Sequence, residues 1–365
     1  MNKYLSSKIK IISFICIIMV VFLHCYNFTD NFLLPQTTIS EGLNIATFIE
    51  FFLCNGFTRI AVPIFFMISG YLFFLTYKLS IEKYFYKVKS RFLSLMIPYL
   101  IWSIIGIGLC YLLKNIDIMP INDMKTNYSD GGFFNVLYNP PNFQFWFIKQ
   151  LFIYTILSPI IYLLVKYKIP SCIYFALIFI AWFLDLPFGP IIVCEALMFF
   201  SFGASLAVRD KSSIIMGKIS KNKIIISLIL WLVILCLKTV LAGIFTQDSN
   251  VLIIVILHKA SILIGIFAAW YGIDFVIENS KFADKILDLS SHTFFIYCFH
   301  EPLLDIVIQY TLVFLANSFA FNLVTYFIYP TCAILIAILL SSILLKYAPS
   351  LHNILTGNRG TRRKK

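Results

Sequence analysis

Residues 251–276 read VLIIVILHKASILIGIFAAWYGIDFV, and apolar side chains occupy almost every position of this run. About 20 apolar residues in a helix are enough to cross the roughly 30 Å of hydrocarbon in a bilayer. A helix is expected because lipid offers no hydrogen bonds to backbone groups. The run therefore predicts a membrane-spanning helix, and it carries His258 and Lys259 inside the membrane.

Similar runs fill most of the chain. Of its 365 residues, 60% are apolar and only 13% are charged, whereas soluble domains are nearer half apolar and a quarter charged. This composition excludes a soluble enzyme, and a mean hydropathy of +0.90 excludes a disordered chain. We predict an all-α integral membrane protein, a bundle of ten transmembrane helices near 9–28, 59–77, 92–113, 143–165, 170–184, 190–208, 223–244, 251–276, 293–316 and 319–345.

The basic residues predict the orientation. Of the 29 Lys and Arg residues, 23 lie at the termini or in one set of alternating loops, and only three lie in the other set. By the positive-inside rule, both termini are cytoplasmic. The formal charge of +12 then reflects topology, so we expect no nucleic-acid partner. We predict a membrane domain over 1–350 and a basic cytoplasmic tail, 351–365, that rests on anionic membrane lipid.

The segments 29–58 and 114–142 are expected to face outward. Ile45 to Leu53 is a candidate interfacial helix, and the stretch DGGFFNVLYNPPNFQ (130–144) is typical of a polar loop over the mouth of a cavity.

Several ionisable residues occupy one predicted depth. With a helical rise of about 1.5 Å per residue, they lie within about 11 Å of the outer end of their spans. A charge inside a span usually faces the interior of the bundle, so we predict that these side chains surround a polar cavity open to the outside: His24, Arg59, Lys149, Glu195, Lys238 and His258. A second group, on the ninth span, comprises His300, Glu301 and Asp305.

Structural explanations compete with each functional one. Lysines can extend to the interface, as Lys149 and Lys238 could, and an ion pair with either would account for Glu195. His258 could be a hydrogen-bonded core histidine. The Ser69-Gly70 pair is typical of close helix packing. His300 and Glu301 could form a pair at a proline kink, and Trp146 and Trp102 could be interfacial anchors.

Five segments, in order, are similar to acyltransferase family 3, a family of integral membrane O-acyltransferases. They are IISFICIIMVVFLHCYNF (11–28), TRIAVPIFFMISGYLFFL (58–75), QFWFIKQLFIYTILSPIIYLL (144–164), LMFFSFGASLA (197–207) and SSHTFFIYCFHEPLL (290–304). The end of the chain, YAPSLHNILTGNR, is also similar, so the resemblance covers nearly the whole sequence.

The resemblance implies transfer of an acyl group, commonly acetyl, from cytoplasmic acetyl-CoA to a hydroxyl of a glycan or lipid-linked sugar in the bacterial inner membrane. The family's histidine on the first helix maps to His24, its arginine before Ala-Val-Pro to Arg59, and its late histidine to His300. Many members also have Trp-Ser-x-x-x-Glu on the fourth helix, where this chain has Trp146, Phe147 and Lys149. The carboxylate is therefore unassigned, and Glu195 is a substitute candidate.

Acyl transfer to an alcohol needs a base, donors for the developing oxyanion and exclusion of water. The imidazole of His24, about one helical turn below the membrane surface, stays largely neutral at pH 7 and suits the base. Arg59 supplies a fixed positive charge suited to a phosphate of the donor or to an anionic acceptor. The candidates for binding substrate or donor are Arg59, Ser69, Lys149, Trp146, Tyr297 and His300. The cysteines and histidines show no metal-like spacing, so we expect no metal. A transporter that binds a polar or anionic solute without covalent chemistry is the alternative.

Overall fold

The structure is a computed structural model, and it describes residues 2–26, 38–39, 42–77, 79–115, 132–189, 191–245, 252–278, 280–314 and 319–359. Within these ranges the regular elements are helices, together with one isolated bridge between Phe188 and Ile192. The described chain divides into a first unit, Met1–Tyr77, Ser158–Ser290 and Asn317–Pro330, and a second unit, Lys78–Leu157, Ser291–Ala316 and Thr331–Lys365.

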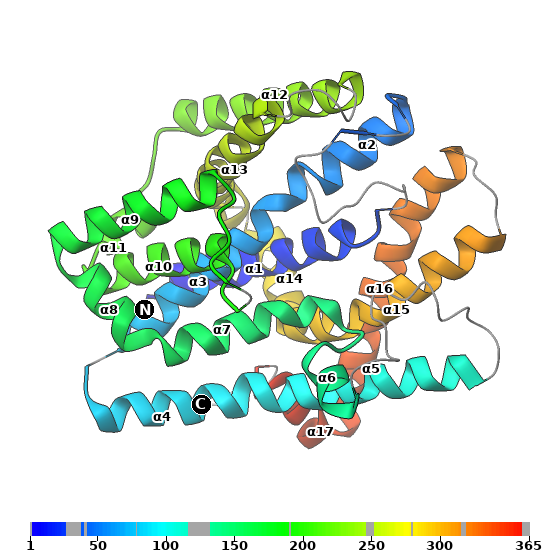
Figure 1. Cartoon of the computed structure of the whole chain (residues 1–365), viewed down its shortest axis with the longest axis horizontal. Coiled ribbons are helices and arrows are strands. Elements are labelled where there is room, and N and C mark those ends of the chain that lie inside the picture. The colour runs from blue at the N-terminus through cyan, green and yellow to red at the C-terminus, as the bar shows by residue number, and fades with distance from the viewer. Residues whose placement is uncertain are drawn as a thin grey trace. The chain divides into compact units, whose positions relative to one another are not determined.

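The helices of the first unit can be followed by their labels in Figure 1. Its elements are α1 (Lys3–Leu23), α2 (Ile45–Cys54), η1 (Phe57–Ile60), α3 (Ala61–Phe74), α8 (Ser158–Lys166), α9 (Lys168–Phe183), α10 (Cys194–Val208), α11 (Ser212–Met216), α12 (Lys221–Ile244), α13 (Leu252–Glu278), α14 (Ser280–Leu289) and the start of α16 (Phe319–Tyr347).

The second unit holds the remaining elements. They are α4 (Ile81–Arg91), the π-helix η2 (Phe92–Met96), α5 (Ile97–Asn115), α6 (Gly132–Tyr138), η4 (Phe143–Phe145), α7 (Trp146–Ile156), η5 (Ser290–His292), α15 (Thr293–Phe314), the rest of α16 and α17 (Pro349–Thr356). Residues 132–138 of the predicted polar loop are the helix α6, and residues 116–131 lie outside the described part of the chain.

Six helical runs in the described residues are long and apolar enough to cross a membrane: α1, Ile45–Phe74, Ile81–Leu113, α12, α13 and Phe321–Tyr347. A seventh forms if the bent pair Phe143–Ile156 and Ser158–Lys166 is one span. The chain is thus a multi-pass membrane protein. Each of the ten predicted ranges contains a helix, but α9 and α10 are short and α15 is broken at Glu301, where the backbone is not helical. Counting apolar runs does not detect such breaks.

Two glycines allow α3 and α10 to approach closely (Figure 1). A Cβ atom on Gly203 would overlap the backbone oxygen of Met67, and one on Gly70 would overlap that of Phe200. Small residues at a helix crossing permit this backbone contact. Gly70 therefore allows close helix packing, as the structural interpretation of the Ser69-Gly70 pair predicts.

Replacing Gly203 with alanine is expected to destabilise the protein by about 1–3 kcal/mol, because the added methyl group must push α10 away from α3. The measurement is the thermal unfolding midpoint of the purified protein in detergent. Gly108→Ala on α5 is the matched control, because no atom lies within 4 Å of a Cβ at that position. Equal midpoints for the two variants would contradict this account of the crossing.

Buried polar contacts attach α17 within the second unit. The Ser341 hydroxyl lies 2.8 Å from Nδ1 of His292 and 2.9 Å from Nε2 of His352. The Trp102 indole donates to the carbonyl oxygen of Leu355 at 3.1 Å. The interpretation of Trp102 as an interfacial anchor is wrong, because this side chain is buried and its N–H caps a helix carbonyl.

Candidate active site

Arg59 lies in the break between α2 and α3. The last carbonyls of a helix have no partner within the helix, and here side chains just beyond α2 supply the donors. Arg59 Nε donates to the Cys54 carbonyl oxygen at 3.1 Å, and Nη2 donates to Oδ1 of Asn55. The Thr58 hydroxyl donates to the carbonyl oxygens of Leu53 and Cys54. These bonds fix the plane of the guanidinium group.

Asn55 also joins this loop to α12 and α13. Nζ of Lys238 donates to the backbone oxygen of Asn55 and lies 3.0 Å from Nδ1 of His258. Lys238 and His258 are buried. Lys238 is therefore held inside the protein. The alternative interpretation, that its ammonium group extends to the membrane interface, is wrong.

Glu195, near the start of α10, belongs to the same cluster. Its Oε2 accepts a hydrogen bond of 2.7 Å from the Trp182 indole, and it interacts electrostatically with Lys259 and Arg59. Lys259 forms an ion pair of 2.6 Å with Asp185, and its Nζ lies 4.7 Å from the centre of the Trp182 ring. Glu195 thus contacts the Trp182 indole and interacts with Lys259 and Arg59. The alternative interpretation paired it with Lys149 or Lys238.

The end of α1 reaches the same region. His24 follows the last residue of α1 and is half-buried. The Cys54 thiol donates to the carbonyl oxygen of Leu23 at 3.0 Å, which links this end to the Arg59 loop. Tyr326 at the start of α16 is buried and interacts electrostatically with Arg59 and Glu50.

Two buried donors in this cluster have no hydrogen-bond partner within the described residues: Nδ2 of Asn55 and the hydroxyl of Tyr326. A buried donor without a partner is costly. Asn55 bonds Arg59 through its side-chain oxygen, and Tyr326 interacts electrostatically with Arg59. These donors suit a polar molecule that carries acceptor oxygens.

The other predicted site residues lie elsewhere. Ser69 is half-buried on α3. Lys149, Trp146, Tyr297 and His300 belong to the second unit. Lys149 Nζ donates to the Tyr138 carbonyl oxygen at 2.9 Å. Tyr297 donates to the carbonyl oxygen of Gln144, also at 2.9 Å, and Nδ1 of the buried His300 lies 3.0 Å from the carbonyl oxygen of Ile296.

Two amide side chains support the break in α15. Asn142 Nδ2 donates to the Glu301 carbonyl oxygen at 2.6 Å, and Gln144 Nε2 donates to those of Tyr297 and Glu301 at 3.3 and 3.4 Å. Pro302 has no N–H group and interrupts the helical bonding. The two amides thus donate hydrogen bonds to carbonyl groups beside His300. The broken helix leaves these carbonyl groups without their usual backbone donors.

Replacing Asn142 with alanine is expected to destabilise the protein by about 1–3 kcal/mol, because the Glu301 carbonyl oxygen loses its shorter hydrogen bond and keeps only the 3.4 Å bond from Gln144. A lowered thermal unfolding midpoint would show it. Asn139→Ala, at an exposed position on the same segment, is the control. An Asn142→Ala midpoint no lower than that of Asn139→Ala would show that the amide is not needed at the break.

Three residues of this cluster were not predicted from the sequence: Asn55, Glu50 and Tyr326. Asn55 and Glu50 lie in IATFIEFFLCN (45–55), which was assigned to an outward segment rather than to a span. The structure has this stretch in a single candidate span, Ile45–Phe74. Glu50 and Asn55, polar residues in a mostly apolar stretch, were the available signal, because such residues usually face a protein interior.

Comparison with known proteins agrees with the sequence motifs. The sequence model of acyltransferase family 3, described as an acyltransferase domain, matches residues 8–346. The chain belongs to acyltransferase family 3. It is also similar to the succinoglycan biosynthesis protein ExoH of Rhizobium meliloti (strain 1021), with 26% identity over 372 residues, 98% of this chain and 94% of that protein. No solved structure matches the chain significantly. The resemblance to acyltransferase family 3 is confirmed.

Proposed function

We propose that this protein is an O-acetyltransferase of the bacterial inner membrane. It moves the acetyl group of cytoplasmic acetyl-CoA to a hydroxyl of a cell-envelope glycan or a lipid-linked saccharide. The observation that carries the proposal is the cluster of Arg59, Lys238, His258 and Glu195 around Asn55 in a member of acyltransferase family 3. The similarity to a protein named for succinoglycan biosynthesis supports a glycan acceptor. The proposed topology has ten spans and two cytoplasmic termini.

In the proposed reaction, His24 takes the proton of the acceptor hydroxyl while that oxygen attacks the thioester carbonyl carbon. The carbon–sulfur bond then breaks, and the departing thiolate recovers the proton from the imidazolium. Arg59 and the free donors of Asn55 and Tyr326 stabilise negative charge on the carbonyl oxygen. Each step is a proton transfer or an acyl transfer, so no oxidant or metal enters the balance.

The carboxylate has two candidates. Glu195 is held by the Trp182 indole and lies in electrostatic range of Arg59. Glu50 is fully buried on α2 and interacts with Cys54 and Tyr326. We assign Glu195 the catalytic role of orienting the cationic groups. Ser69, Lys149, Trp146, Tyr297 and His300 are proposed to bind the donor, which predicts a raised KM for acetyl-CoA in their variants.

The test supplies the purified full-length protein with acetyl-CoA labelled in the acetyl group and a cell-envelope glycan extract. The expected product is labelled glycan whose label is released by mild alkali, as an O-acetyl ester requires. Glu195→Gln and Glu50→Gln, measured in parallel, assign the carboxylate. Solute flux in sealed vesicles without any thioester, together with no labelled glycan, would show that the protein is a transporter.

A further inference from the structure

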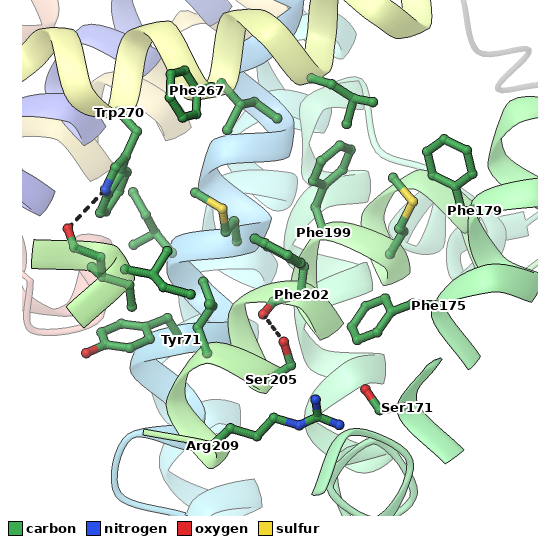
Figure 2. Close-up of a pocket in the computed structure, with 18 of the residues that line it drawn as sticks. Tyr71, Ser171, Phe175, Phe179, Phe199, Phe202, Ser205, Arg209, Phe267 and Trp270 are labelled. Carbon is green, nitrogen blue, oxygen red and sulfur yellow. Dashed lines mark hydrogen bonds between the residues drawn. The ribbon is translucent and has the colours of Figure 1, made fainter. Parts of the chain in front are cut away.

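A cavity lies in the first unit, and none of the cluster residues around Asn55 lines it. Its volume is about 800 Å³, and α3, α9, α10 and α13 form most of its wall (Figure 2). Cavities that hold small molecules usually measure about 300–1,000 Å³. The cavity is therefore large enough for an organic ligand.

One end of the cavity is aromatic and open to the surroundings. Phe179, Phe202 and Phe267 line it, and each has about two fifths of its surface exposed, at 41%, 44% and 40%. Large apolar surfaces of this kind mark binding sites or membrane contacts. In a multi-pass membrane protein the medium beside such a wall is lipid, so hydrocarbon has access to the cavity.

The other end is polar. Arg209 lies there with Ser171 and Ser205 (Figure 2). Arg209 Nε donates to the Val165 carbonyl oxygen at 2.8 Å, and Nη2 donates to that of Tyr167 at 2.9 Å. A guanidinium group has five N–H donors, so these two bonds hold Arg209 in place and leave donors for an anion.

The segment that follows this end of the cavity is mainly basic. Residues 209–223, which follow α10, carry five basic residues, Arg209, Lys211, Lys218, Lys221 and Lys223, against one acidic residue, Asp210. Basic segments at a membrane surface attract anionic lipid head groups. An anionic head and an apolar body together match the two ends of the cavity.

We infer that this cavity binds an anionic phospholipid, with its phosphate at Arg209 and acyl chain among Phe179, Phe202 and Phe267. In the proposed topology the lipid comes from the cytoplasmic leaflet. A polar solute would leave the aromatic wall without a partner, and a zwitterionic lipid would bring a phosphate whose charge its own ammonium group already offsets. The inference concerns lipid binding alone and does not depend on acetyl transfer.

The test is native mass spectrometry of the full-length protein, purified in mild detergent and equilibrated with equal amounts of dioleoyl phosphatidylglycerol and dioleoyl phosphatidylethanolamine. The wild type is expected to retain more phosphatidylglycerol. Arg209→Gln should lower the ratio of the two bound lipids about fivefold, the effect of one basic residue near a membrane. Lys211→Gln, which removes an exposed charge from the same loop, is the matched control and should leave the ratio unchanged.

Two more variants separate binding from folding. Arg209→Lys keeps the charge and should keep the preference for phosphatidylglycerol. Ala176→Trp, which fills the cavity from α9, should lower retention of both lipids without changing their ratio. The inference is wrong if Arg209→Gln and Lys211→Gln give equal ratios. It is also wrong if, when palmitoyl-CoA is added together with the two lipids, the protein retains palmitoyl-CoA and neither lipid.

Discussion

Replacement of His24 with alanine is expected to lower acetyl transfer by about 10²- to 10⁴-fold, the range that a general base contributes. His24 stands at the end of α1 and is half-buried, so a substrate hydroxyl can reach its imidazole. Its neighbour Leu23 contacts Cys54, whose carbonyl oxygen accepts from Arg59. Two hydrogen bonds, one on each side of Cys54, thus connect the end of α1 at His24 to the guanidinium group of Arg59.

The measurement is the initial rate of labelled acetyl transfer by protein purified to equal amounts. His24→Gln is the matched variant, because glutamine keeps polar contacts but does not accept a proton near neutral pH. It should be as slow as His24→Ala while keeping the thermal unfolding midpoint of the wild type. If His24→Gln transfers acetyl at the wild-type rate, another residue is the base.

The helices and the family could be predicted from the sequence, because apolar runs and ordered motifs are local signals. Each predicted span contains a helix, and the motif order led to the family that the comparison shows. The interruptions were harder to predict. The break at Glu301 depends on amide donors from Asn142 and Gln144, and these residues are more than 150 positions away in sequence.

The candidate site could be predicted in part. Depth along a helix follows from the rise per residue, and this placed Arg59, Lys238 and His258 at similar depth. Depth does not determine the direction in which a side chain points or the unit to which its helix belongs. Lys149, assigned to the same depth, belongs to the second unit and binds Tyr138 there.

Asn55 holds two basic side chains in one small region. Its side-chain oxygen accepts from Arg59 and its backbone oxygen accepts from Lys238. The carbonyl dipoles of Asn55 favour positive charge on the Arg59 guanidinium group, and electrostatic interactions are strong where water is excluded. An anionic intermediate would be attracted by Arg59. The arrangement is therefore suited to stabilising negative charge as it develops rather than to binding a neutral ground state.

Arg59→Ala is accordingly expected to lower the rate by about 10²- to 10³-fold, as the loss of an oxyanion donor does in other enzymes. Arg59→Lys should restore little of this rate, because a lysine ammonium cannot reproduce the planar fork that spans Cys54 and Asn55. The loss should appear in kcat and in kcat/KM alike, since the interaction strengthens in the transition state.

Chemical rescue distinguishes this role from a structural one. Guanidinium ion added at millimolar concentration should enter the space vacated in Arg59→Ala and raise its rate severalfold, while urea at the same concentration should not. Both molecules are planar and similar in size, but urea is uncharged and has a carbonyl oxygen in place of one NH₂ group. If neither molecule raises the rate and the unfolding midpoint is lowered, Arg59 stabilises the loop after α2 and does not act in the reaction. If both raise the rate equally, the charge of Arg59 is not needed.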